Sequence, residues 1–451
     1  MLTLRKGFIV ILLGLMLSGC TTLQTGESEL KGAGYQVSKT DLQSVHRMNR
    51  VMVSDTALLD YLNGILAKLE AAQGEPCNCQ VFVDSTPNYE AYTPSPNTIV
   101  LSAGVVAQAE SEDEIAALLA HELSHVVNSD STKSIFQNAL ITAIRAGGIA
   151  AGNGYSLLLG ESAKEAANGL IYNRWSAEQE MRSDAFAVEL LAKAGYSQEG
   201  LKYAIRRVGE FSENALASRD TSTSSCITSA GDNNFNVDFA ECTAGLTGSR
   251  ESVYQDEEAR FTAVNERIWE LPDDDRRLRP SSPPPRFESI DYLYGLTALN
   301  ISNEQRLREG LAQVEARAIP DTLQRNAFVY NQLAKANALL GNSSEAQAYF
   351  AKTLESDYRT TFNYQHLLDF ANKQKDTKMI GDLISAMHQD LGMSPEMLPV
   401  EYYLARRYDL TFIEAQALVR CTMAFAQDLD LAKRCSNFGK AADQNKVVSW
   451  L

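Results

Sequence analysis

Histidine and basic residues are scarce in this chain. Five of its 451 residues are histidine, and 41 Lys and Arg stand against 57 Asp and Glu, which gives a formal net charge of -16. This acidic balance argues against nucleic acid as a partner and against attachment to an anionic membrane through charge alone. Apolar residues, by contrast, make up 45% of the chain, which is ample for two or three domains with full cores.

Two of the five histidines lie four residues apart in His121-Glu122-Leu123-Ser124-His125. Positions i and i+4 share one helix face, so both imidazoles can reach one metal ion, and Glu122 can take a proton from an attacking water. The flanks indicate a helix, with a capping box of Ser111 and Glu114 followed by an apolar stripe: Ile115, Leu118, Leu119 and Val126. The motif therefore predicts a catalytic zinc site. The alternative is a surface helix with two solvated histidines.

A catalytic zinc site needs a third protein ligand, and the segment 178–184 supplies two candidate glutamates. Glu180 falls on a helix face shared with Asp184, Ala187 and Leu191, whereas Glu178 falls on a charged face with Arg182, Glu189 and Lys193. We therefore predict Glu180 as the ligand. Asp184, one turn further on, is predicted to accept a hydrogen bond from the outer nitrogen of a zinc-bound histidine. The alternative is a solvated or salt-bridged acidic face.

Together these segments resemble a known family. The run 97–104, the segment 114–126 with its two histidines, Glu180 four residues before Asp184, and Ala194-Gly195-Tyr196 are similar to the zinc endopeptidases that include the CaaX prenyl proteases, HtpX and BepA, metallopeptidase family forty-eight. The resemblance covers residues 46–295. It implies a mainly α (α+β) protease domain with a small β-sheet and one Zn²⁺ per chain. It also implies that the strand at 97–104 lies at the edge of the cleft.

Two of the chain's departures from that family concern residues expected near the site. Relatives often carry Ser-Arg before the ligand glutamate, where this chain has Ser176-Ala177, which leaves Arg174 or Arg182 as a substitute. Relatives also carry His-Pro followed by Arg. Here the histidine is lost at Pro280 and the arginine is kept as Arg286. We predict that Arg286 is catalytic and stabilises the tetrahedral oxyanion, with a structural salt bridge as the alternative.

Residues 1–20 resemble a bacterial lipoprotein signal. Arg5 and Lys6 precede an apolar run at 8–17 that is too short to span a bilayer, and the following Leu17-Ser18-Gly19-Cys20 resembles an acylation site at Cys20. Because Thr21 rather than Asp comes next, the resemblance implies a lipid anchor on the periplasmic face of the outer membrane of a Gram-negative bacterium. Residues 21–45 are predicted to form a tether. An ordinary soluble secreted protein is the alternative.

Six further cysteines remain beyond Cys20. In an oxidising compartment Cys226 with Cys242, and Cys421 with Cys435, are disulfide candidates, although sequence alone does not fix their connectivity. Cys77-Asn78-Cys79 is a weak candidate for a second metal site, because no further cysteine or histidine lies nearby. A structural or redox-active pair is the more natural interpretation.

Residues 300–451 change to continuous amphipathic helix. An apolar pattern with Gly341 at a turn fits a tetratricopeptide helix pair: Tyr330, Leu333, Ala334, Ala346, Phe350 and Leu354. A weaker second copy follows 34 residues later: Tyr364, Leu367, Ala371, Ile380 and Ile384. We predict a helical-repeat domain whose concave face binds polypeptide, with a non-repeating bundle as the alternative.

Residues 213–259 are rich in Ser, Thr and Asn and are predicted to form an inserted lid-like loop beside the site, closed into a smaller loop by Cys226 and Cys242. The family resemblance implies that the substrates are misfolded or stalled envelope proteins, and that the repeats engage the outer-membrane assembly machinery. The alternative belongs to another class of protein. It is a periplasmic chaperone or assembly factor that acts by binding through its repeats, with proteolysis rare or latent.

Overall fold

The computed structural model describes residues 27–128, 177–220, 250–424 and 429–446, apart from 75, 96, 301 and 302, together with 228–229, 235–236, 448 and 450. This part of the chain is mainly helical with small sheets, as the sequence predicts. None of its helices is long and apolar enough to cross a bilayer. The predicted acylation site Cys20 lies outside the described residues.

A three-stranded sheet borders the predicted metal helix. Its strands are β3 (Gln80–Asp84), β4 (Ala91–Ser95) and β5 (Thr98–Ser102), in the order β3-β5-β4, with β5 parallel to β3 and antiparallel to β4. The strand at 97–104, expected at the edge of the cleft, is β5 and lies at the centre of the sheet. All five residues of β5 are buried because it pairs on both sides, and β4 occupies the edge.

The metal helix α5 (Glu112–Val127) lies at the centre of a helical layer. It packs against the sheet and against α3 (Thr56–Gln73), α8 (Ala177–Ala194) and α9 (Glu199–Asp220), so that it is buried from Asp113 to Val126. Ser111 caps it by accepting a hydrogen bond from the Glu114 amide at 3.3 Å. The carboxylate of Glu114 instead accepts from the amide of Glu110 at 3.0 Å. Only one of the two hydrogen bonds of the predicted capping box is therefore present.

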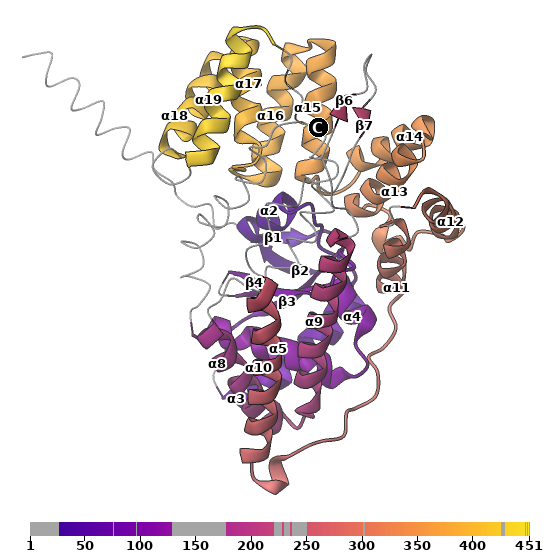
Figure 1. Cartoon of the computed structure of the whole chain (residues 1–451), viewed down its shortest axis with the longest axis vertical. Coiled ribbons are helices and arrows are strands. Elements are labelled where there is room, and N and C mark those ends of the chain that lie inside the picture. The colour runs from indigo at the N-terminus through magenta and orange to yellow at the C-terminus, as the bar shows by residue number, and fades with distance from the viewer. Residues whose placement is uncertain are drawn as a thin grey trace, which may run out of the picture.

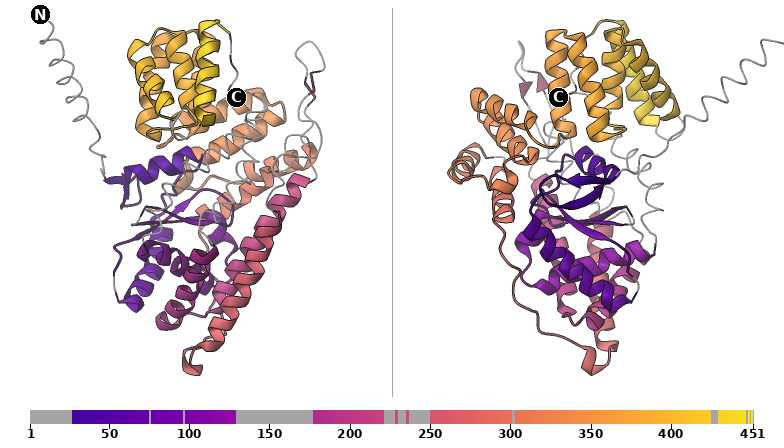
Figure 2. Two further views of the ribbon diagram at one scale, coloured as in Figure 1. Left: turned by 60° about the vertical axis from the view of Figure 1, so that its left-hand side comes forward. Right: turned by 180° about the vertical axis from the view of Figure 1, so that it is seen from behind.

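Two long helices, α9 and α10 (Arg250–Glu270), run side by side next to α8 (Figure 2). In the part of the chain that links these two helices, the short strands β6 (Thr228–Ser229) and β7 (Phe235–Asn236) form a two-stranded ribbon. The predicted loop 213–259 is thus helical at both of its ends. Apart from these helical ends and the strands β6 and β7, that range lies outside the described residues, and its role as a lid stays a prediction.

The two cysteines of this loop belong to the same undescribed part of the chain. The structure describes neither Cys226 nor Cys242. The predicted bridge of Cys226 to Cys242 therefore stays a prediction, whereas the predicted bridge of Cys421 to Cys435 is present among the described residues.

Helix α4 (Ala103–Gln108) follows β5 and contacts α11 (Glu288–Gly295). The helices that follow α11 in the chain form antiparallel pairs at the far end of the molecule (Figure 1). They are α12 (Glu304–Glu315), α13 (Ala327–Leu339), α14 (Ser343–Leu354), α15 (Thr361–Gln374), α16 (Thr377–Leu391), α17 (Leu398–Arg407), α18 (Thr411–Ala424) and α19 (Leu429–Asp443). The disulfide Cys421–Cys435 joins α18 to α19.

The second helices of three successive helix pairs start 34 residues apart. The first helices α13 and α15 start at 327 and 361, and the second helices α14, α16 and α18 start at 343, 377 and 411. A residue with positive φ comes two before each second helix, namely Gly341 at 76°, Lys375 at 56° and Asp409 at 54°. The third copy was missed from sequence, since its first helix α17 starts at 398 and so departs from this spacing.

Helix α2 (Lys39–Arg47) connects the sheet to the repeats (Figure 1). On one side, Asp41 accepts hydrogen bonds from the hydroxyls of Ser95 and Thr98, at 2.8 and 2.7 Å. On the other side, Gln43 and Arg47 donate to the last carbonyls of α16, those of Gln389 at 3.0 Å and Leu391 at 2.6 Å. Helix α2, which follows the hairpin of β1 (Glu27–Leu30) and β2 (Tyr35–Ser38), thereby caps a repeat helix with its side chains.

His46 on α2 is buried at this contact, beside the carbonyl of Asp390 and the ring of Tyr358. Burial lowers the pKa of His46 to about 4. Because the pKa of a histidine in the unfolded chain is higher, unfolding takes up a proton below about pH 6.5, and the stability held by the neutral ring is lost as the pH falls toward 4.

We expect His46→Phe to reduce the acid sensitivity of the fold. The wild type should lose up to about 1.4 kcal/mol more unfolding free energy per pH unit between about pH 6.5 and 4 than the variant does. Urea unfolding followed by circular dichroism at several pH values measures the difference. Parallel pH profiles for the two proteins would contradict the assignment to His46.

Candidate metal centre

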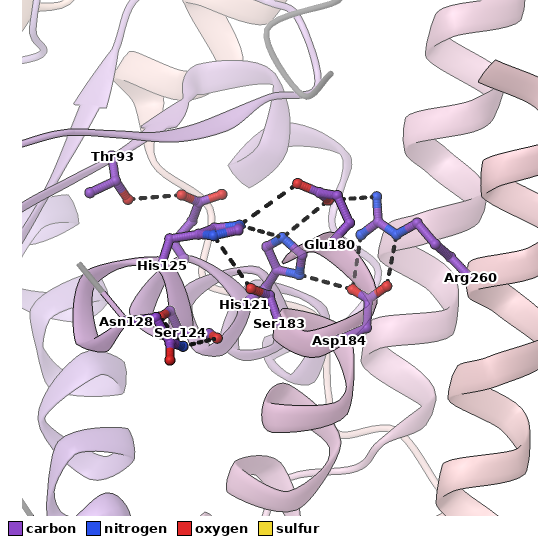
Figure 3. Close-up of polar contacts among 10 residues, drawn as sticks. Thr93, His121, Ser124, His125, Asn128, Glu180, Ser183, Asp184 and Arg260 are labelled. Carbon is purple, nitrogen blue, oxygen red and sulfur yellow. Dashed lines mark hydrogen bonds and ion pairs between the residues drawn. The ribbon is translucent and has the colours of Figure 1, made fainter. Parts of the chain in front are cut away.

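Helices α5 and α8 bring three metal-binding side chains together (Figure 3). His121 and His125 lie on one face of α5, and their Nε2 atoms are 3.2 Å apart. Glu180 enters from α8, with its carboxylate oxygens 3.5 Å from Nε2 of His121 and 3.8 Å from Nε2 of His125. All three side chains are buried. The choice of Glu180 over Glu178 by helix periodicity agrees with this geometry, since Glu178 is exposed.

The distances between these donor atoms suit a metal ion with tetrahedral coordination. Zn²⁺ binds nitrogen and oxygen at about 2.0–2.1 Å, so adjacent donors of a tetrahedron lie about 3.3 Å apart. Among the described residues, neither buried oxygen of Glu180 accepts a hydrogen bond, although Oε2 lies in an ion pair with Arg260. Two ring nitrogens and a carboxylate that face one another in this way form a site for a cation.

The outer edges of the histidines are held by α8. Nδ1 of His121 donates to Oδ1 of Asp184 at 2.9 Å, the contact predicted for Asp184, and this leaves the lone pair on Nε2 facing inward. Nδ1 of His125 lies 3.4 Å from the hydroxyl of Ser183. Burial opposes protonation of His121, but the carboxylates of Asp184 and Glu180 outweigh it and raise the pKa of this ring to about 10. The surroundings thus favour positive charge at the site.

Arg260 on α10 joins the two acidic residues of α8. Its guanidinium contacts Oε2 of Glu180 at 2.9 Å and both oxygens of Asp184, at 2.7 and 2.9 Å. Burial alone would raise the pKa of Asp184, but Arg260 and His121 hold it well below its ordinary value. The fork geometry fixes the spacing of the two carboxylates on the helix.

Glu122 follows His121 on α5, and its side chain is buried. Thr93 on the edge strand β4 donates its hydroxyl proton to Oε2 of Glu122 at 2.8 Å. Burial raises the pKa of Glu122 to about 7, against the opposing effects of His121 and Thr93. A carboxylate with a pKa near neutrality suits proton transfer in both directions.

The other arginines predicted from sequence fall elsewhere. Arg286 is exposed, in the extended segment before α11, and the neighbouring Phe287 packs on Tyr61 of α3. Its role in oxyanion stabilisation stays a prediction. Arg182 is exposed on α8, and Arg174 lies outside the described residues. The arginine that contacts the site, Arg260, was missed because no local pattern marks it.

We expect Thr93→Val to slow peptide cleavage about tenfold through kcat, since one hydrogen bond that orients the base is lost. KM and zinc content should change little, because Thr93 touches neither ligand histidine in the contacts described above. Thr93→Ser keeps the hydroxyl and is expected to restore the rate. Equal kcat values for the Val variant and the wild type would show that Glu122 is oriented without Thr93.

We expect Arg260→Met to weaken zinc binding by about ten- to a hundredfold, since the partner that orients Glu180 and Asp184 is removed. Competition with a chromophoric chelator measures this affinity. Arg267→Met is the matched control, because Arg267 lies on the same helix and pairs only with the partly exposed Glu189 and Glu270 in the ion pairs described. An Arg260 variant with the affinity of the control would rule out this positioning role.

Comparisons with known proteins agree with the site. The sequence profile of peptidase family M48 matches residues 60–241, which include all three candidate ligands. The chain is 24% identical over 175 residues to a Vibrio cholerae protein named putative beta-barrel assembly-enhancing protease, covering 36% of this chain and 35% of that protein. It is 31% identical over 161 residues to the metalloprotease YcaL of Escherichia coli, covering 34% of this chain and 59% of YcaL. The chain therefore spans about a third and three fifths of the lengths of these relatives. Residues 60–241, which hold the buried His121, His125 and Glu180, therefore match peptidase family M48.

Proposed function

We propose that this protein is a zinc-dependent metalloendopeptidase. The observation that carries the proposal is the convergence of His121, His125 and Glu180 on one point, with the carboxylate of Glu122 beside them. Two histidines and one acidic ligand leave a fourth position of a tetrahedral zinc free for water or substrate, as a catalytic rather than a structural site requires.

The chain's own residues divide the work of peptide hydrolysis. Bound zinc would supply Lewis acidity that activates water and polarises the peptide carbonyl. Glu122 takes the proton from the attacking water and returns it to the leaving amine. Thr93 orients Glu122, while Asp184 keeps the proton of His121 on the outer nitrogen and so keeps Nε2 available to the metal.

Unfolded or misassembled envelope polypeptides are the proposed substrates, in quality control and outer-membrane protein assembly. The name of the Vibrio cholerae relative supports this role, as does the predicted lipoprotein signal that ends at Cys20. We propose that the protein is lipid-anchored at the periplasmic face of the outer membrane, and that its helix pairs contact substrate or assembly machinery. Cys20→Ser is expected to release it from outer-membrane fractions.

A second candidate function is that of a periplasmic chaperone that binds polypeptide and rarely cleaves it. The three helix pairs, whose second helices start 34 residues apart, favour it, because stacked pairs of this kind form extended binding surfaces. Complementation of a deletion strain separates the two candidates. A variant of Glu122 that cannot cleave should restore growth only if binding suffices.

Removal and return of metal tests the proposed activity directly. The purified mature protein is expected to hold about one zinc per chain and to degrade unfolded casein. A zinc chelator should abolish cleavage, and stoichiometric zinc should restore it. Casein degradation that persists in metal-free protein would overturn the proposal.

A further inference from the structure

We propose that Cys77 and Cys79 form a redox-active disulfide that oxidises dithiols of unfolded polypeptides. The pair lies in the segment that links α3 to β3, and its Cα atoms are 5.2 Å apart. It is separate from the three metal ligands and from Glu122 in sequence and in the contacts described above. The inference therefore does not depend on the proposed peptidase activity.

The loop that this disulfide closes is too short for the bond to serve mainly in stabilising the fold. A disulfide stabilises a fold largely by restricting the unfolded chain, and this effect grows with the length of the closed loop. Cys77 and Cys79 are two positions apart, whereas Cys421 and Cys435 are 14 apart and join two helices. The first bridge closes the smaller loop by far, so its reduction should cost the fold less.

The two sulfurs differ in their accessibility. Cys77 is partly exposed, whereas Cys79 is 8% exposed. Asn78 between them is exposed and adopts the left-handed conformation at φ 52°, which asparagine tolerates. An incoming thiolate would therefore meet the sulfur of Cys77 first. This asymmetry is the arrangement that thiol–disulfide exchange requires, with one attacked sulfur and one protected leaving sulfur.

Glu70, in the last turns of α3, favours the reduced state of the pair. Its Oε1 accepts the amide proton of Cys77 at 3.1 Å and lies 2.9 Å from Sγ of Cys77. In the disulfide this sulfur carries no hydrogen, so the second contact gains nothing. In the dithiol the S–H group can donate to the carboxylate, a charge-assisted hydrogen bond. The carboxylate therefore makes the disulfide easier to reduce and a stronger oxidant.

The reaction balances as an exchange of two electrons and two protons. A thiolate of the polypeptide attacks Sγ of Cys77, the Cys77–Cys79 bond breaks, and Cys79 leaves as a thiolate that takes up a proton. A second thiolate of the polypeptide attacks the mixed disulfide, and Cys77 leaves and is protonated beside Glu70. The polypeptide gains a disulfide, and the pair ends as a dithiol. A small disulfide such as oxidised glutathione can reoxidise it by the reverse exchange.

Redox titration of the full chain tests the first half of the proposal. The protein is equilibrated at pH 7 in glutathione buffers, quenched with acid and alkylated, and each cysteine pair is quantified by peptide mass spectrometry. We expect the Cys77–Cys79 pair to titrate reversibly within the glutathione range, while Cys421–Cys435 stays oxidised as an internal control. In Glu70→Gln the reduction potential of the pair should fall by about 30 mV. This is about a tenfold change of the exchange equilibrium in favour of the disulfide. A Cys77–Cys79 pair as resistant to reduction as Cys421–Cys435, or an unmoved midpoint in Glu70→Gln, would overturn the proposal.

Oxidation of a reduced dithiol peptide tests the second half. The assay uses Glu122→Gln protein, so that loss of peptide by cleavage cannot be mistaken for oxidation. We expect stoichiometric disulfide formation in the peptide, turnover when oxidised glutathione is supplied, and neither when Cys77→Ser and Cys79→Ser are combined. Equal oxidation rates with and without the two cysteines would restrict the pair to a structural role.

Discussion

Replacing Glu122 with Gln is expected to lower the rate of casein cleavage by about three orders of magnitude or more, while the protein still binds about one zinc per chain. The two side chains have the same shape, so Gln can keep the contact with Thr93. The amide, however, cannot accept a proton from the attacking water. The variant therefore separates loss of the base from loss of the metal.

Zinc content by inductively coupled plasma mass spectrometry and initial rates of casein cleavage together measure this effect. Glu178→Gln is the matched control, because it is the same substitution on an exposed face of α8. The control should keep the rate of the wild type. A Glu122→Gln protein that is folded, zinc-loaded and nearly as fast as the wild type would show that another group acts as the base.

Glu180→Ala is expected to leave the purified protein without zinc and without proteolysis, as are His121→Ala and His125→Ala. Each ligand supplies one of three protein donors, and two donors do not hold the ion against competing chelators. The loss of Glu180 also leaves the partly buried guanidinium of Arg260 with one acidic partner fewer, so some loss of fold stability should accompany the loss of metal.

Glu178→Ala makes the same change two positions earlier on α8. It therefore distinguishes the loss of a metal ligand from a general effect of the substitution on the helix. We expect it to bind zinc as the wild type does. Full zinc occupancy in Glu180→Ala, with the three-residue cluster otherwise intact, would show that the third ligand was assigned wrongly.

Local sequence patterns were sufficient for the three candidate ligands and insufficient for what surrounds them. His121 and His125 follow from i, i+4 spacing, and Glu180 follows from the apolar face that it shares with Ala187 and Leu191. Each of these patterns lies within one helix. Helix periodicity also places Asp184 on the face where it meets His121.

Thr93 and Arg260 could not be found in this way, because each reaches the site from another element. Which strand lies at the sheet edge depends on long-range pairing, and Thr93 comes from the edge strand β4, so no local pattern marked it. The third helix pair was missed because its first helix α17 starts at 398, which breaks the 34-residue spacing between the starts of α13 and α15.

The contacts around Arg260 have a consequence for the charge balance of the centre. With Glu122, Glu180 and Asp184 ionised, three negative charges stand against the single positive charge of Arg260, and the histidines that ligate a metal are neutral. These residues together are therefore two charges short of neutrality, and one divalent cation supplies both. A monovalent ion leaves one charge among these buried side chains uncompensated, which is costly. The charge balance at this centre thus favours a divalent over a monovalent cation. The imidazole and carboxylate donors then determine which divalent metal binds.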